Sequence, residues 1–232
     1  MSLLKRRVAA AMVVIGVASL VTLLQVEANH ETDDQIGTEA VWNPANEDLN
    51  EISKTCKDKK PGDYPGCFVE EMGGYASSEA VGFTQLLEAQ KPSRLGYLDG
   101  IKEAGIVDLG YVIYPDGTKT KQGWVLMNGV PSLVNVDNVS LLPQGQMEKD
   151  PRYIALKKDH PQLQLVVTDD QRRSDESPQI ESKADGVERF VIPYTLQENC
   201  KGCGPLGYAI FGFDFDAAGQ FRGKKFIKVT AQ

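Results

Sequence analysis

The residues best able to do chemistry in this chain are four cysteines, which lie in two pairs close in the sequence. Cys200 and Cys203 form the short motif Cys-Lys-Gly-Cys, and Cys56 and Cys67 enclose a segment rich in proline and glycine. That segment has no sequence signal for secondary structure. An even number of cysteines is typical of disulfide-bonded proteins from oxidising compartments. We therefore expect two disulfides, Cys56–Cys67 and Cys200–Cys203.

The Cys200–Cys203 pair has two further interpretations. In a redox pair, Cys200 would be the exposed nucleophile, Cys203 the resolving thiol, and Lys201 would stabilise a thiolate. Thioredoxin-like sites place this motif at the start of a helix, whereas here a glycine, a proline and a predicted strand follow it. In a zinc site, Cys56 and Cys67 would add two ligands, but they lie too far apart for a zinc knuckle. The sequence predicts no metal and no cofactor.

Histidine-based and metal-based catalytic sets are not assembled in the sequence. His30 lies in a polar segment, and His160 precedes a proline at a predicted helix end, where an imidazole commonly interacts with the last carbonyls. No nucleophile elbow, phosphate-binding loop or His-Glu-x-x-His motif occurs. Asp214-Phe215-Asp216 resembles the opening of a calcium loop, but Ala218 and Lys225 occupy ligand positions. We expect a hairpin turn there.

Four further side chains are candidates for binding a ligand. Trp124, Tyr111 and Tyr208 fall in predicted strands, where aromatic residues line either a core or a pocket, and a core is the commoner outcome. Asp108 would lie inside the sheet as a base in one strand register, or face water in the other.

The elements that would position these residues follow from hydrophobic periodicity. Capping residues and prolines predict helices over residues 78–90 and 151–159. Asn128-Gly129 predicts a two-residue hairpin turn, and residues 169–186 read as an exposed loop. Alternating apolar residues predict strands over residues 106–114, 124–127, 132–136, 163–168, 190–196, 209–215 and 221–229.

This succession predicts an α+β fold, with an antiparallel sheet of about six strands and two or three helices packed on one face. A helix lying across a curved sheet, as in cystatin-like or nuclear-transport-factor-like folds, is the specific expectation. Such a fold carries no function by itself.

The N-terminus has the pattern of a signal peptide. Lys5-Arg6-Arg7 precedes an apolar stretch from Val8 to Leu24, and small residues before Asn29 predict cleavage after Ala28. The alternative is an uncleaved anchor. We therefore expect a signal peptide over residues 1–28, a flexible acidic leader over 29–50 and a single disulfide-stapled α+β domain over 51–232.

Charge and export together limit the function. The net charge of −7, without a basic stripe, argues against binding nucleic acid or an anionic membrane. We expect a periplasmic or secreted binding or interaction protein, without catalysis and without a stable membrane span after cleavage. Its partner would be a protein or small molecule of the cell envelope, recognised at the sheet or at the loop 169–186. The alternative is a thiol-disulfide oxidoreductase or redox-responsive protein that uses Cys200 and Cys203.

Overall fold

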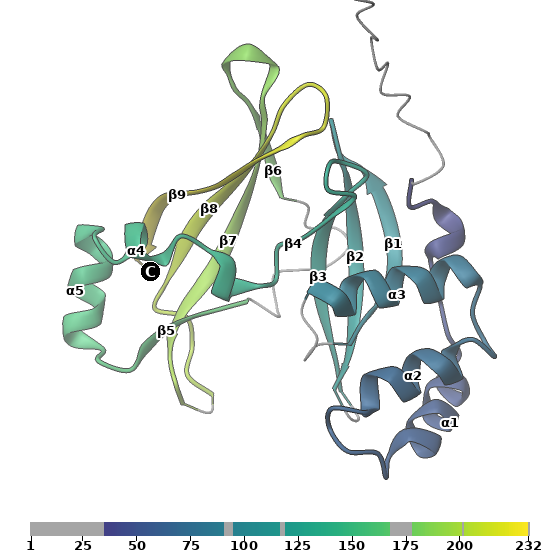
Figure 1. Cartoon of the computed structure of the whole chain (residues 1–232). Coiled ribbons are helices and arrows are strands. Elements are labelled where there is room, and N and C mark those ends of the chain that lie inside the picture. Colours follow the sequence, from purple (N-terminus) through teal and green to yellow (C-terminus); the bar gives the residue numbers. More distant parts are fainter. Residues whose placement is uncertain (1–34, 91–94, 117–118, 168–177, 201, 232) are drawn as a thin grey trace, which may run out of the picture. The chain divides into compact units, whose positions relative to one another are not determined.

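The computed structural model describes residues 35–90, 95–116, 119–167, 178–200 and 202–231, all of which belong to one structural unit, Asp33–Gln232 (Figure 1). The expected signal peptide and the first residues of the expected leader lie outside the described residues. Within the described ranges, no helix is long and apolar enough to cross a membrane.

The fold is α+β, as predicted, but its strands form two antiparallel sheets rather than one sheet of about six strands. The four-stranded sheet has the order β1-β2-β3-β4, and the five-stranded sheet has the order β5-β7-β8-β9, with β6 also paired to β7. The strands are β1 Tyr97–Glu103, β2 Asp108–Asp116, β3 Lys119–Met127, β4 Leu133–Asn135, β5 Leu163–Val166, β6 Gln179–Ser182, β7 Glu188–Glu198, β8 Gly207–Phe215 and β9 Phe221–Ala231.

The described residues also form five α-helices and three short 3-10 helices. The α-helices are α1 Asn46–Cys56, α2 Tyr64–Met72, α3 Ser78–Gln90, α4 Gln144–Met147 and α5 Pro151–Asp159, and the 3-10 helices are η2 Thr38–Ala40, η3 Val139–Leu141 and η4 Ala184–Gly186. Both predicted helices, α3 and α5, are confirmed with their predicted ends. At the start of α5, the Asp150 side chain accepts a hydrogen bond of 2.8 Å from the Arg152 amide.

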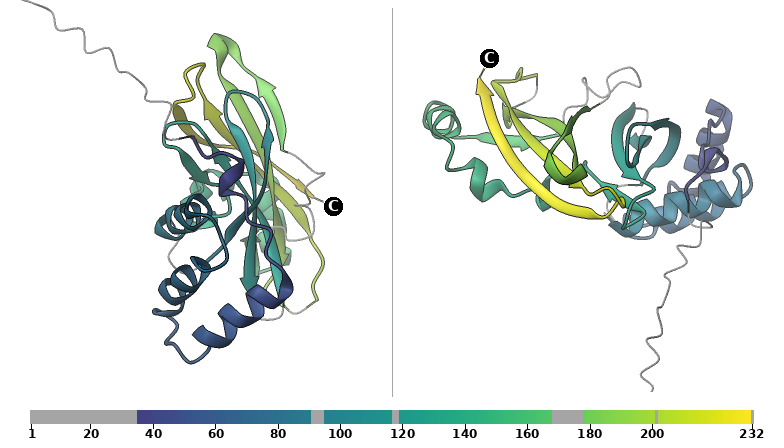
Figure 2. Two further views of the ribbon diagram at one scale, coloured as in Figure 1. Left: turned by 90° about the vertical axis from the view of Figure 1, so that its right-hand side faces the viewer. Right: turned by 90° about the horizontal axis from the view of Figure 1, so that it is seen from above.

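Helix α3 lies against one face of the four-stranded sheet (Figures 1 and 2). Phe83 and Leu87 are buried on Leu98 and Val112 of that sheet. The last residue of α3, Gln90, donates to the Leu133 carbonyl at 2.7 Å and accepts from the Asn135 amide at 3.0 Å. Both contacts satisfy backbone groups of β4, the strand at the end of the sheet order.

The region before α3 is more ordered than the sequence suggested. The expected leader extended to residue 50, yet η2 and the start of α1 lie within it. Trp42 anchors this segment, because its amide donates to the Leu98 carbonyl at 2.8 Å and its ring packs edge-on against Phe68 and Tyr97. A few buried aromatic contacts therefore order a segment whose composition is mostly polar.

The first disulfide joins α1 to α2. Cys56 ends α1, Cys67 lies in α2, and their Cα atoms are 5.8 Å apart. The expectation that the enclosed segment lacks secondary structure is wrong, because α2 begins at Tyr64. Pro65 occupies the first turn of that helix, where proline is tolerated. Beside the bridge, Ile52 and Phe68 are buried in a core of their own.

The hairpin at Asn128-Gly129 is longer than predicted. Asn128 has the expected positive φ of 63°, but the strands close through a bond from its amide to the Ser132 carbonyl, at 2.9 Å. The loop is held by the β8–β9 turn, since the Val130 amide donates to Gly219 at 2.8 Å and the Val130 carbonyl accepts from Phe221 at 2.9 Å. A side chain at Gly129 would meet the Gly219 carbonyl. Contacts from the other sheet, rather than local turn preference, fix this loop.

The five-stranded sheet contributes the largest core cluster. Phe190, Ile192 and Tyr194 of β7 and Phe211 and Phe213 of β8 are fully buried in it, as their alternation predicted. Side chains from the other sheet and its flanking loops, and from α4 and α5, join this cluster: Val107, Leu109, Trp124, Leu126, Val134, Val136, Leu142, Met147 and Tyr153. The β6 strand and η4 lie within residues 169–186, which were expected to form a loop.

Removal of the Cys56–Cys67 bridge should destabilise the α1–α2 region. The double variant Cys56→Ser and Cys67→Ser removes the cross-link, so the unfolded chain gains conformational freedom. For a loop of this size, the gain lowers the stability of the fold by about 3 kcal/mol. The free energy of unfolding in urea should fall by about that amount, measured by circular dichroism under oxidising conditions. An unchanged unfolding midpoint would contradict this expectation.

Candidate functional site

A cleft of about 430 Å³ is lined mainly by outward-facing side chains of the five-stranded sheet, and also by Trp124, a buried residue of the core cluster. This volume is within the range of small-molecule sites. The residues that line it come from β3, from β6 and the residue before it, and from β7, β8 and β9: Trp124, Pro178, Gln179, Glu181, Val191, Pro193, Ile210, Ile227, Lys228 and Thr230.

Strand pairing sets the floor of the cleft. Pro193 of β7 lies opposite Ile210 of β8, which lies opposite Lys228 of β9, so that these three residues form a row across the sheet. Val191 is two residues before Pro193 and faces the same side. The floor is therefore mainly apolar, and the polar groups lie toward the edges.

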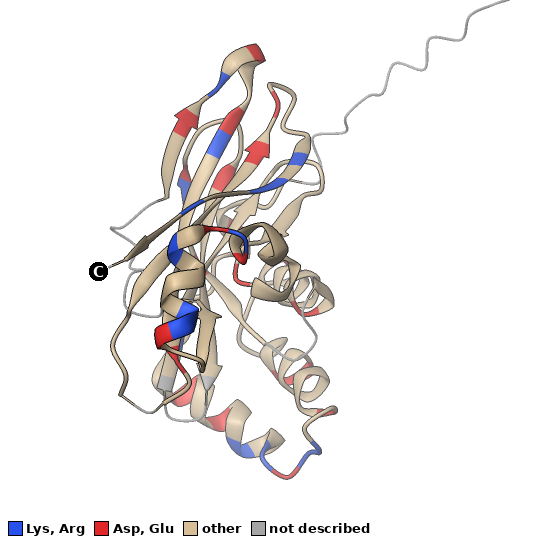
Figure 3. Cartoon of the chain, turned by 90° about the vertical axis from the view of Figure 1, so that its left-hand side faces the viewer, with Lys and Arg blue, Asp and Glu red and all other residues tan. Residues whose placement is uncertain are grey.

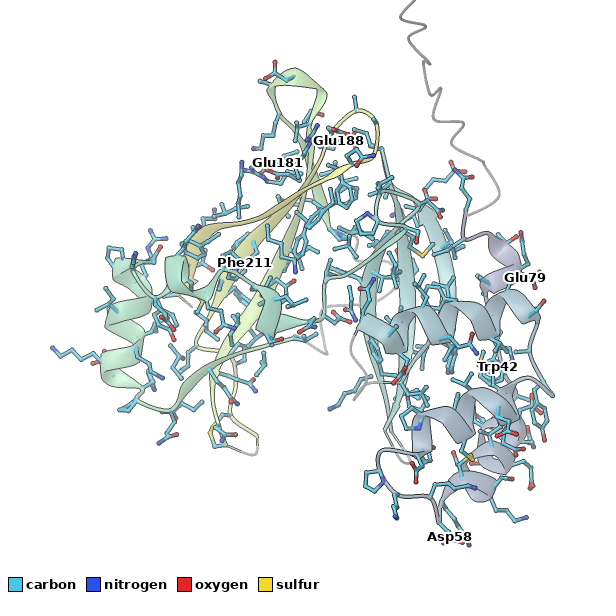
Figure 4. All side chains as sticks on the ribbon, in the orientation of Figure 1. Trp42, Asp58, Glu79, Glu181, Glu188 and Phe211 are labelled. Carbon is cyan, nitrogen blue, oxygen red and sulfur yellow. A yellow bond between two sulfur atoms is a disulfide. The ribbon has the colours of Figure 1, made fainter. Side chains whose placement is uncertain are left out.

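The cleft is lined by charges of both signs, Glu181 and Lys228. Figure 3 shows how acidic and basic residues are spread over the strands and helices of the chain. Glu181, labelled in Figure 4, pairs with Lys183 on the same hairpin. The hydrogen bond from Lys183 lowers the pKa of the Glu181 carboxyl, and the charges of Arg189 and Lys228 act in the same direction. Among the described residues, Lys228 has no ion-pair partner within 4.0 Å. It is the cation at the cleft that remains available to a ligand.

Next to the cleft, a buried carboxylate holds the β7–β8–β9 face together. Asp214 is 3% exposed and accepts two hydrogen bonds from the Arg189 guanidinium, at 2.6 and 2.8 Å. The Lys225 ammonium lies 3.2 Å from Oδ2, the oxygen that also accepts from Arg189 Nη2. A Cβ at position 212 would lie 2.5 Å from the Arg189 side chain, so glycine at this position makes room for the Arg189–Asp214 ion pair. Burial raises the pKa of the Asp214 carboxyl, but the hydrogen bonds and charges of Arg189 and Lys225 lower it by more. The net effect is a lowered pKa.

The structure brings only one of the predicted ligand residues to the cleft. Trp124 lines it, and Tyr111 is the cross-strand neighbour of Trp124 in the core cluster. Asp108 accepts a hydrogen bond of 2.6 Å from the Asn128 side chain and lines no part of the cleft. Tyr208 lies on the outward face, opposite Thr230, but is not among the lining residues.

The second place with reactive side chains is the turn between β7 and β8. The Cys200–Cys203 disulfide is present there, and no helix follows it among the described residues before β8. Lys201 lies outside the described residues. The nearest donor atoms of Glu198, Cys200 and Cys203 all lie within 4.8 Å of one another. Sulfurs joined to each other are not thiolate ligands, so in this state the cluster is a disulfide beside a carboxylate.

His160 follows α5 and reaches the same turn. Its Nδ1 lies 3.2 Å from the Glu198 carboxylate, so it contacts a side chain rather than the helix carbonyls that the sequence suggested. Both side chains are about one third exposed. The second histidine of the sequence, His30, lies outside the described residues. Glu198 was not predicted, although its position two residues before Cys200 was a usable signal.

The aspartates of the expected hairpin turn are both occupied by protein groups. Asp214 pairs with Arg189, and the Asp216 side chain accepts from the Ala218 and Gln220 amides at 3.0 and 2.9 Å. The Asp216 side chain therefore forms an Asx-turn with the backbone amides that follow it. The predicted hairpin is confirmed.

No protein-family model matches the chain, and no curated protein or solved structure shows a significant similarity to it. Its function is therefore inferred from its own residues.

The Asp214 pair should make stability depend on pH. Because the folded pKa of the Asp214 carboxyl is lowered, the pair stabilises the fold above the unfolded pKa of about 4 and loses this contribution as pH falls through the lower folded pKa. Asp214→Asn should lower the free energy of unfolding at pH 7 by about 2 to 3 kcal/mol and flatten its loss in acid. Urea unfolding from pH 7 to about 3 measures both effects. The control is Asp185→Asn, an exposed residue at φ 61°, where asparagine is equally tolerated.

Proposed function

We propose that this chain is an exported binding protein that captures a small molecule with an apolar body and an anionic head group. The observation that carries the proposal is the cleft on the outward face of the five-stranded sheet. Its volume suits a ligand of one or two rings or a short acyl chain.

The lining supports this ligand class. An apolar body would lie on Pro193 and Ile210 and against Trp124, where the removal of apolar surface from water favours binding. Lys228, at the end of the Pro193–Ile210 row, would pair with the anionic group. Glu181 is paired with Lys183, and Asp214 is paired with both Arg189 and Lys225. Among the described residues that line the cleft, Lys228 is therefore the cation without an ion pair within 4.0 Å.

Export is the second part of the proposal. The N-terminal pattern of Lys5-Arg6-Arg7, an apolar stretch and small residues before Asn29 favours translocation and cleavage. The two disulfides fit an oxidising compartment, such as the periplasm or the extracellular space.

Binding is tested with anilinonaphthalene sulfonate, an aromatic anion whose fluorescence increases in apolar sites. In a Trp42→Phe background, the probe should bind with one-to-one stoichiometry and quench the remaining Trp124. Lys228→Gln should weaken binding about tenfold, which corresponds to about 1.4 kcal/mol. Ile210→Phe, which adds bulk to the cleft floor, should abolish binding.

The matched control is Lys158→Gln, which removes an exposed lysine of α5 away from the cleft lining. This variant should bind the probe like the parent. Equal affinities for the Lys228 and Lys158 variants would remove the cleft assignment, as would several weak equivalent sites.

Export is tested by the intact mass of the protein recovered from the envelope fraction or the medium of its native host. The mass should correspond to a chain that begins at Asn29 and carries two disulfides. A full-length chain with free thiols in the cytosol would overturn this part of the proposal.

A further inference from the structure

We infer that Cys200–Cys203 is a thiol–disulfide exchange site in which Glu198 transfers protons at the sulfurs and His160 positions Glu198. This activity is separate from ligand capture in the cleft. It requires a reaction partner of a defined chemical class, a thiol or dithiol that reduces the bridge or a disulfide that restores it.

The two disulfides of the chain differ in accessibility. Cys200 is exposed and Cys203 is half-buried, in a turn where the Cys200 amide bonds to the Glu198 carbonyl at 2.9 Å. In the first bridge, Cys56 is 0% exposed and Cys67 is half-buried, so neither residue is as exposed as Cys200. Exchange requires a thiolate to approach one sulfur along the bond to the other. An external thiol therefore reaches Cys200 more readily than either cysteine of the first bridge.

The carboxylate is placed for proton transfer at these sulfurs. An oxygen of Glu198 and both sulfurs fall within 4.8 Å of one another, a separation that one water molecule can bridge. His160 Nδ1 lies 3.2 Å from the Glu198 carboxylate, and this contact fixes the orientation of the carboxylate. Glu198 is thus the catalytic residue and His160 a positioning residue.

Among the described residues, α5 brings further charged groups near this pair. The Lys157 ammonium donates to the carbonyl of Leu163, the strand partner of Glu198, at 2.8 Å. Lys158 and Asp159 are exposed in the last turn of the helix, next to His160. Of the described carboxylates, Glu198 is the one grouped with the sulfurs.

Reduction would proceed in two exchange steps. A partner thiolate attacks Cys200 Sγ, so that a mixed disulfide forms, the Cys200–Cys203 bond breaks and its electron pair moves to Cys203 Sγ. Cys203 then takes a proton through Glu198, which regains one from solvent. The second thiolate of the partner attacks the partner sulfur of the mixed disulfide, so that the bond to Cys200 Sγ breaks and Cys200 leaves as a thiolate, which takes a proton from solvent. In total, two electrons and two protons pass from the partner dithiol, which becomes a disulfide, to the Cys200–Cys203 pair.

The first test compares the two disulfides of the native full-length chain. It is titrated with dithiothreitol, quenched in acid, alkylated and mapped by peptide mass. Cys200–Cys203 should open at a dithiothreitol concentration at least about tenfold lower than Cys56–Cys67. Opening of both bridges together, only when denaturant is added, would overturn the inference.

The second test traps the intermediate. Cys203→Ser should form a mixed disulfide at Cys200 when incubated with glutathione disulfide, whereas Cys200→Ser should leave the half-buried Cys203 largely unmodified. Equal modification of the two variants would contradict the assigned roles of nucleophile and resolving thiol.

The third test separates proton transfer by Glu198 from a simple charge effect. The rate at which the reduced pair reacts with glutathione disulfide is measured against pH. Glu198→Gln should slow the reaction at pH 7 about tenfold or more and move the profile to higher pH, because thiolate formation loses its proton acceptor. Were the carboxylate only a nearby negative charge, its removal would favour the thiolate, speed the reaction and move the profile to lower pH. That result would overturn its catalytic role.

Controls address folding and positioning. Glu70→Gln, an exposed glutamate of α2, should leave the rate unchanged. His160→Ala should slow the reaction and shift the profile in the same direction as Glu198→Gln, while His160→Gln, which keeps a hydrogen-bond donor, should restore most of the rate. A wild-type profile in His160→Ala would remove the positioning role.

Discussion

The alternation of side chains along β7 and β8 is the constraint on which the rest of this structure depends. Phe190, Ile192 and Tyr194 face the core and are fully buried, while Val191 and Pro193 face the cleft. Because side chains alternate with a period of two, a slip of one residue would exchange these faces and expose the aromatic core. β7 also pairs with β5, β6 and β8, so the same register sets the cleft and carries the chain to Glu198.

Two links from β7 to residues next to the strands of the first sheet depend on the same register. Tyr194 donates to the Val136 carbonyl at 2.6 Å from within the core. Glu188, at the start of β7 and labelled in Figure 4, accepts from the Ile106 amide at 2.7 Å. Near this contact Gly105 has a φ of 139°, and a side chain there would collide with the Glu188 carboxylate. Glycine at this position therefore permits the link between β7 and the β1–β2 turn.

The sequence predicted the elements whose signals are local. α3 and α5 carry capping residues and prolines, and β7 and β8 alternate strictly, so their positions followed from periodicity. The sequence missed α1, α2, β1, α4 and β6, and three of these, α1, α2 and β6, are stabilised by distant contacts. The Cys56–Cys67 bridge joins the first two, and β6 pairs with β7 across the residues that read as a loop. Only Trp124 was predicted among the cleft residues, because outward apolar residues such as Ile210 and Ile227 look like ordinary strand positions until the sheet is assembled.

The second disulfide adds little to a loop that the strands already close. Leu196 pairs with Gly207, and the Leu206 amide donates to the Leu196 carbonyl at 2.8 Å, so the ladder itself brings the ends of the Cys200–Cys203 turn together. A covalent bond stabilises mainly by removing freedom from the unfolded chain, and that gain shrinks as the enclosed loop shortens. The bridge between α1 and α2 encloses the longer loop and joins helices with no shared ladder. The chain therefore depends on Cys56–Cys67 for its fold, whereas Cys200–Cys203 can open without separating β7 from β8, as an exchange site requires.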